Sequence, residues 1–126
     1  MEEKKIIMSA LPKTWIFDLD GTILKHNGYK LDGVDTLLPR AKEFLDGIPE
    51  EDMVIFITSR KRELKELTED FLKKEKIRYQ SIIYDAPYGE RVLVNDKKPS
   101  GLSMAYAVNV NRDCFMEEQF EINDEL

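Results

Sequence analysis

The most informative segment of the sequence is Thr14-Trp15-Ile16-Phe17-Asp18-Leu19-Asp20-Gly21-Thr22. Its first four residues form a short, mostly apolar run, which predicts a buried β-strand. Residues two apart on an extended chain point to the same side, so Asp18 and Asp20 are predicted to converge where this strand ends. Two close carboxylates repel each other unless a cation lies between them or one of them holds a proton, and a hard, oxygen-liganded ion such as Mg²⁺ would relieve the repulsion. A surface turn would account for Gly21, but not for two acids at the end of a central strand.

Further strands and helices are predicted from changes in hydrophobic period along the chain. Continuous apolar runs predict strands at residues 53–57, 81–84, 91–94 and 107–110. Helical patterns are predicted at residues 39–46 and 61–76, with a short third helix near 102–105. Alternation of strands and helices indicates an α/β fold, with a Rossmann-like parallel sheet and flanking helices.

A small flap is predicted between the first strand and the first helix. Asn27-Gly28 lies within residues 23–31, and this dipeptide between apolar and long side chains is a strong β-hairpin signal. The flap would lie beside the carboxyl end of the first strand, where open α/β sheets bind ligands. His26 at its tip is either an exposed loop histidine or a substrate contact.

Two other strand ends carry polar groups. Thr58-Ser59-Arg60 ends the strand 53–57 and opens the long helix, where hydroxyls and free N–H groups bind anions or simply cap the helix. Arg60-Lys61-Arg62 is interleaved with glutamates further on, as on a solvated helix face. Asn95-Asp96-Lys97-Lys98-Pro99 follows residues 91–94 and supplies a third carboxylate beside cations, although a turn is the alternative.

Length and charge limit the function classes. The 126 residues suffice for one domain (1–126), with a predicted core at about 14–110 and an acidic C-terminal arm at about 111–126. The net charge of −6 disfavours a nucleic-acid partner. The lone Cys114 excludes an internal disulfide. No apolar run is long enough to span a membrane and the first residues do not resemble a secretion signal, so we expect a cytoplasmic protein without a membrane partner.

The three strand-end motifs together resemble those of the haloacid dehalogenase-like (HAD) hydrolase superfamily. The resemblance spans about residues 14–110, and Asp18-Leu19-Asp20-Gly21-Thr22 is its most specific part. It implies a Rossmann-like core, a Mg²⁺ cofactor and phosphoryl transfer through an aspartyl-phosphate. An acid at the position of Asp20 is typical of the phosphatases of this superfamily and argues against carbon–halogen chemistry.

The resemblance also implies roles for individual residues. Asp18 would be the nucleophile and Asp20 the general acid/base. Thr58, with Ser59 beside it, would bind the phosphoryl oxygens. Asp96 would complete the metal site with Asp18 and Asp20, the latter through its backbone carbonyl.

One expected residue is missing from its usual place. Small members of the superfamily often carry Gly-Lys-Pro before the last strand, whereas this chain has Asp85-Ala86-Pro87. The cation that offsets the charge of nucleophile and phosphate would then come from Arg91, from Lys97 or from the long helix, and we favour Arg91. Asn95 stands where many relatives have a second acid, which bears on metal affinity.

The predicted function is therefore a Mg²⁺-dependent phosphomonoester hydrolase. The intervals between the motifs hold no separate cap domain, so we expect a capless enzyme that closes its site by forming a homo-oligomer. A small phosphate ester such as a phosphosugar or a sugar-acid phosphate is the preferred substrate. The alternatives are a polynucleotide end phosphatase and a degenerate, non-catalytic module that binds phosphate or metal. Phe115, Met116 and Phe120 of the C-terminal arm would pack on a partner or, equally, on their own chain.

Overall fold

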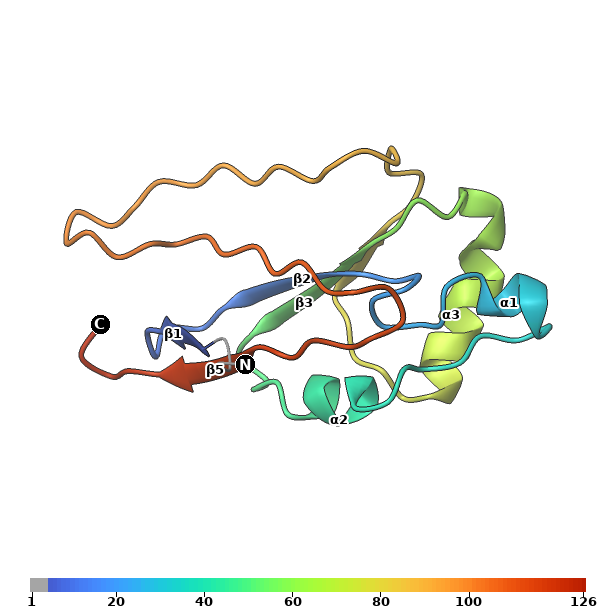
Figure 1. The fold of residues 1–126 in the computed structure, drawn as a ribbon, viewed down its shortest axis with the longest axis horizontal. Helices are drawn as coiled ribbons and strands as arrows, with labels where there is room; N and C mark the ends of the chain where they lie inside the picture. The colour runs from blue at the N-terminus through green and yellow to red at the C-terminus, as the bar shows by residue number, and fades with distance from the viewer. Residues whose placement is uncertain (1–4) are drawn as a thin grey trace.

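The computed structural model describes residues 5–126 and has an α/β architecture (Figure 1). Its main sheet contains three parallel strands in the order β2 (Thr14–Asp18), β3 (Met53–Ile57) and β4 (Ser81–Ile83). Between β2 and β3 lie α1 (Gly28–Leu31) and α2 (Ala41–Asp46), and between β3 and β4 lie the 3₁₀ turn η1 (Arg62–Leu64) and α3 (Lys65–Lys74). These three strands and the helices α2 and α3 confirm the sequence prediction. Over residues 5–126 no helix is long and apolar enough to cross a membrane.

The two faces of this sheet differ in burial. Trp15 and Phe17 of β2 are in register with Val54 and Phe56 of β3, and this face forms the core together with Leu45 of α2 and Leu72 of α3. The other face remains half exposed, as the values of 51% for Ile16 and 50% for Ile83 show. The core therefore lies on one side of the sheet.

The C-terminal arm packs against its own chain. Phe115 and Met116 are buried in the core, and the Phe120 ring meets Trp15 edge-to-face at 5.1 Å. Phe120 lies in β5 (Gln119–Ile122), which pairs in parallel with β1 (Lys5–Met8) in a separate two-stranded sheet. Of the two alternatives for these aromatic and methionine side chains, the structure therefore shows the intramolecular one.

The predicted flap takes a helical conformation. Asn27 has the positive φ (55°) that the Asn-Gly signal requires, but Gly28 then begins the helix α1 and does not return the chain as a hairpin. Among the described residues, β pairing here is limited to two isolated bridges of Leu24, a parallel one with Asp20 and an antiparallel one with Leu37. The hairpin prediction was wrong because the positive φ at Asn27 serves the start of a helical turn.

Residues 87–112 differ most from the sequence prediction. The predicted strands at 91–94 and 107–110 and the helix near 102–105 are not formed, and residues 87–101 are exposed throughout. Figure 1 shows this segment as a long excursion that leaves the sheet after β4 and returns along a second extended path. The composition of residues 91–94 favours a strand, but a strand also needs a neighbouring strand to accept its hydrogen bonds.

Candidate functional site

The candidate site lies at the carboxyl ends of β2 and β3. Asp18 is the last residue of β2 and is in register with Ile57, the last residue of β3, so Thr58 follows immediately beside it. Asp20 follows β2 by two residues and lies close enough to Asp18 for its charge to raise the pKa of that carboxyl. The parallel sheet thus brings together acids and hydroxyls from chain segments about 40 residues apart.

Asp18 is half-buried and faces both a hydroxyl and a cation. The Thr22 hydroxyl donates to its Oδ2 at 3.1 Å, and Arg91 Nη2 lies 3.7 Å from its Oδ1. Burial raises the pKa of Asp18 above its ordinary value, although the Thr22 hydrogen bond and the Arg91 charge oppose that rise. Since 35% of the side chain stays exposed, an incoming ligand can reach the carboxylate.

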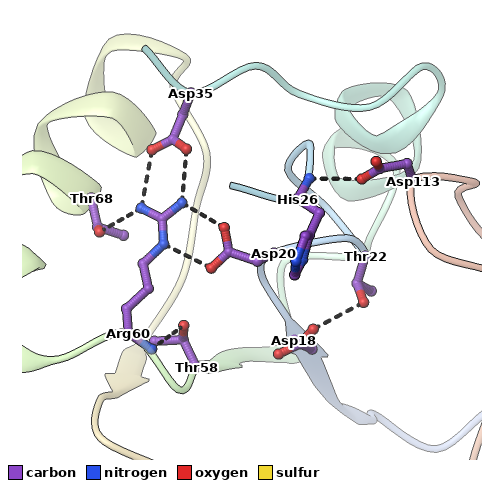
Figure 2. A network of polar contacts seen from close by, with 9 residues as sticks. All are labelled: Asp18, Asp20, Thr22, His26, Asp35, Thr58, Arg60, Thr68 and Asp113. Atoms are coloured by element: carbon purple, nitrogen blue, oxygen red, sulfur yellow. Dashed lines mark hydrogen bonds and ion pairs between the residues drawn. The ribbon is translucent and has the colours of Figure 1, made fainter. Parts of the chain in front are cut away.

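A buried ion-pair network holds Asp20 (Figure 2). Figure 2 shows the Asp20 carboxylate directed toward the guanidinium of Arg60, which also meets Asp35 and Thr68. Arg60 is only 5% exposed, and Asp35, from the loop between α1 and α2, is equally buried. The prediction that Arg60 belongs to a solvated helix face was wrong, because Arg60 precedes the helix and turns inward onto these acids.

Arg60 also changes the electrostatics expected for the two acids. Burial alone would lower the pKa of Arg60, but the hydrogen bonds and charges of Asp20 and Asp35 outweigh it, so the pKa is raised and the guanidinium stays charged. The repulsion between Asp18 and Asp20, which suggested a metal ion, is thus opposed by two side-chain cations, Arg60 at Asp20 and Arg91 at Asp18.

The loop that carries Asp20 is tied to the C-terminal part of the chain. Gly21 has a φ of +83°, in the left-handed region that favours glycine, and its carbonyl accepts a hydrogen bond from the Asp113 N–H at 2.9 Å. The Asp113 carboxylate in turn accepts the backbone N–H of His26 at 2.7 Å, a contact visible in Figure 2. His26 therefore ties the loop to the C-terminal part of the chain through its backbone N–H.

The hydroxyl residues after β3 face in different directions. Thr58 is 1% exposed, and its hydroxyl oxygen accepts the Arg60 backbone N–H at 3.0 Å. The Ser59 hydroxyl lies further out, 3.4 Å from the Pro87 carbonyl and 3.5 Å from Arg91 Nη2. Arg91 thus links Ser59 to Asp18, and these three side chains form the accessible part of the site.

The remaining predicted residues lie elsewhere. Asp96 and Lys97 belong to the exposed excursion, and across residues 5–126 no group of three or more acidic, histidine or cysteine side chains could hold a metal ion. Both carboxylate oxygens of Asp20 are bonded to Arg60, which leaves only its backbone carbonyl, the ligand atom that the resemblance implies. The side chains as arranged therefore do not fit a divalent ion shared by Asp18, Asp20 and Asp96, and the Mg²⁺ cofactor stays a prediction.

The sequence reasoning missed the partners of Asp20. Arg60, Asp35 and Thr68 come from three segments, and nothing in their local patterns links them. One signal was available: Arg60 directly follows the two hydroxyls at the strand end that lies beside Asp20. A long cation at that place can reach the neighbouring acid.

Comparison with known proteins gives structural neighbours only. No protein-family model matches the sequence, and no curated protein matches it. The chain is similar to a chain in the solved structure of a Pnkp1/Rnl/Hen1 complex, with 28% identity and a TM-score of 0.50 over 68% of this chain and 32% of that one. It is also similar to a chain in the structure of the Pnkp1/Rnl/Hen1 RNA repair complex, with 29% identity and a TM-score of 0.52 over 67% and 29%. The matched region is thus about a third of those chains.

Proposed function

We propose that this chain is a phosphomonoester hydrolase of the HAD-like class, in which Asp18 is the nucleophile. The observation that carries the proposal is the placement of an accessible Asp18 carboxylate beside Arg91 and Ser59 at the carboxyl edge of a parallel sheet. A carboxylate offers the attacking oxygen, and a cation with a hydroxyl next to it suits the oxygens of a phosphoryl group.

The proposed reaction has two steps. Oδ1 of Asp18 attacks phosphorus and the bond between phosphorus and the ester oxygen breaks. The protonated form of Asp20, which has taken its proton from water beforehand, gives that proton to the departing alkoxide. Water then attacks the phosphorus of the aspartyl-phosphate while Asp20 takes up a proton, which releases phosphate and restores the Asp18 carboxylate. Arg91 offsets negative charge on the phosphoryl oxygens during both steps.

The substrate is a small phosphate ester or, as a second candidate, a phosphorylated RNA end. The structural similarity to a chain of an RNA repair complex supports the second candidate. Tyr88 also supports it. This residue is 83% exposed and follows Pro87, whose carbonyl accepts the Ser59 hydroxyl, and its ring centroid lies 5.9 Å from Lys61 Nζ. Base rings stack on exposed aromatic side chains of this kind. The net charge of −6 still favours the small ester. A cytoplasmic location and self-association also stay predictions.

A substrate panel tests the proposal. Purified protein is assayed on p-nitrophenyl phosphate, a sugar phosphate and oligoribonucleotides with a 5′- or 3′-phosphate, each with Mg²⁺ and with chelator. We expect phosphate release that falls by at least about a thousandfold in Asp18→Asn, because a carboxamide is a poor nucleophile. Asp46→Asn, which changes an exposed acid on α2, should keep wild-type activity. Full activity in Asp18→Asn would remove the assignment, and binding of phosphate without hydrolysis would favour the non-catalytic module.

A further inference from the structure

The guanidinium of Arg60 has every donor in use. Nε and Nη2 donate to the two oxygens of Asp20, both at 2.9 Å, while Nη1 and Nη2 donate to the two oxygens of Asp35 at 3.0 and 2.7 Å. Nη1 also donates to the Thr68 hydroxyl at 2.9 Å. An arginine has five N–H donors, so these five bonds leave none for a ligand.

Arg60 is also enclosed. Its side chain is 2% exposed, and its Cζ lies 4.5 Å from the centroid of the Tyr29 ring on α1. Turning toward a phosphate would require the guanidinium to leave the buried Asp35 carboxylate, the partly buried Asp20 carboxylate and this ring, at a large cost in desolvated charge. Arg60 therefore cannot serve as a phosphate ligand in this arrangement.

Arg91 has the opposite properties. Its side chain is 40% exposed, and its contacts to Ser59 and Asp18, at 3.5 and 3.7 Å, are long. A cation held so loosely can turn to a substrate without breaking a strong bond. Of the two arginines near the acids, only Arg91 is free to bind the substrate, so Arg60 must act in another way.

We propose that Arg60 is a positioning residue that fixes the Asp20 carboxylate at the reacting centre, and that Asp35 in turn fixes Arg60. The inference rests on the proposed function, in which Asp20 exchanges protons with the ester oxygen and with water. Two parallel N–H···O bonds fix both the place and the plane of a carboxylate. Each oxygen of Asp20 keeps a further lone pair, so the held carboxylate can still meet a proton. Displacement of a catalytic group by about 1 Å is enough to cost about a hundredfold in rate.

Three substitutions loosen the network to different degrees. Arg60→Lys keeps the positive charge, but an ammonium has three donors and cannot make both paired contacts. Asp35→Asn leaves Asp20 untouched and turns an amide N–H₂ toward the donors of Arg60. Thr68→Val removes one acceptor of the five and is the mildest change. All three act on Asp20 only through Arg60.

The test is the dependence of kcat/KM on the leaving group, because this parameter reports the steps up to phosphoryl transfer. A nitrophenolate leaves without a proton, whereas an alkoxide needs one from Asp20. Asp20→Asn is the reference variant. Its kcat/KM should fall strongly on an alkyl phosphate and only slightly on p-nitrophenyl phosphate. We expect Arg60→Lys and Asp35→Asn to lose about tenfold to a hundredfold on the alkyl ester and at most about threefold on the nitrophenyl ester.

Controls separate positioning from general damage. Arg78→Lys alters an arginine that bonds backbone carbonyls near Pro49, and it should leave the ratio between the two substrates unchanged. Thermal unfolding gives the folded fraction of each variant, and Thr68→Val remains informative where Arg60→Lys does not fold. In the double variant Asp20→Asn/Arg60→Lys, the second change should add little on the alkyl ester, because the group it positions is gone.

The outcomes distinguish this inference from the proposed function. Equal losses on both substrates in the folded variants, or additive losses in the double variant, would show a purely structural role for Arg60 and overturn the inference while the hydrolase remains. A folded wild-type protein that hydrolyses neither ester nor a phosphorylated oligoribonucleotide would overturn both.

Discussion

Two neighbouring regions of the molecule reverse the usual distribution of side chains between interior and surface. At the carboxyl ends of β2 and β3, the charged side chains of Arg60 and Asp35 are buried. In the excursion at residues 87–112, Val92 and Val94 are 83% and 88% exposed. A charged group is thus out of water where a solvated helix face was expected for Arg60, and apolar groups are in water where a strand was expected.

The difference shows what each arrangement requires. A buried charge is tolerated when it is paired and hydrogen-bonded, and among residues 5–126 no buried side-chain polar atom lacks a partner. An apolar extended segment requires a neighbouring strand and a covered face. The N–H groups of residues 88–97 make no backbone hydrogen bond within the described chain. The buried acids therefore have hydrogen-bond partners, whereas the N–H groups of residues 88–97 have no backbone partner.

The largest expected effect is a difference in the free energy of unfolding between variants of two arginines. Arg60→Met leaves the buried carboxylate of Asp35 and the partly buried one of Asp20 without their cation, which should lower the free energy of unfolding by about 3–5 kcal/mol. Arg91→Met removes an exposed contact at 3.7 Å and should change it by less than about 1 kcal/mol. Urea unfolding at an unchanged m-value measures both. Similar losses in the two variants would contradict the contrast between the regions.

A second pair compares apolar side chains in the two regions. Phe56→Ala empties a fully buried site in β3 and should cost about 3–4 kcal/mol. Val94→Ala should stay within about 0.5 kcal/mol, because its side chain is 88% exposed. The same unfolding experiment applies. A loss above about 1.5 kcal/mol for Val94→Ala would mean that residues 91–94 are buried in solution, as the sequence pattern predicted.

The sequence predicted those parts of the fold whose signals are local. β2 and β3 follow from short, mostly apolar runs, and α3 follows from the helical pattern at residues 61–76, which includes the fully buried Leu72. Residues 91–94 have the same kind of run, but whether a run becomes a strand depends on a neighbour that no local pattern specifies. The acids at the end of β2 were recognised as a group, whereas Arg60 pairs with Asp35, which lies 25 positions away in the chain. Long-range pairing of this kind leaves no periodic trace.

A glycine in the loop that carries Asp20 is expected to have an intermediate effect. Gly21→Ala places a Cβ at φ +83°, which costs about 1–2 kcal/mol, and brings it to 3.2 Å from Arg112 Cγ. Gly33→Ala is the matched control, because Gly33 has a φ of +81° but no atom within 4 Å of the added Cβ. Thermal unfolding of both should show the larger loss for Gly21→Ala. An equal loss would mean that the Arg112 side chain moves aside freely.

The smallest expected effect concerns Asp18 and depends on pH. Because burial raises the pKa of Asp18 in the folded protein above the ordinary 3.8, folding favours the protonated carboxyl. Its contribution to stability is complete below pH 3.8 and is lost as pH rises through the raised value. Asp18→Asn does not ionise, so it should be more stable than wild type at pH 7, by less than about 1 kcal/mol because the site is partly exposed.

The sign and the pH window distinguish this effect from an ordinary loss of contact. The gain for Asp18→Asn over wild type should shrink to near zero as pH falls below about 4, because both residues are then neutral. Asp46→Asn, which breaks the exposed pair with Lys42 on α2, should instead lose about 0.3–0.5 kcal/mol at pH 7. A destabilised Asp18→Asn at pH 7 would show that Arg91 and Thr22 hold the carboxylate more strongly than burial opposes it. The negative charge of Asp18 would then be offset by its neighbours, as the charge of Asp20 is offset by Arg60.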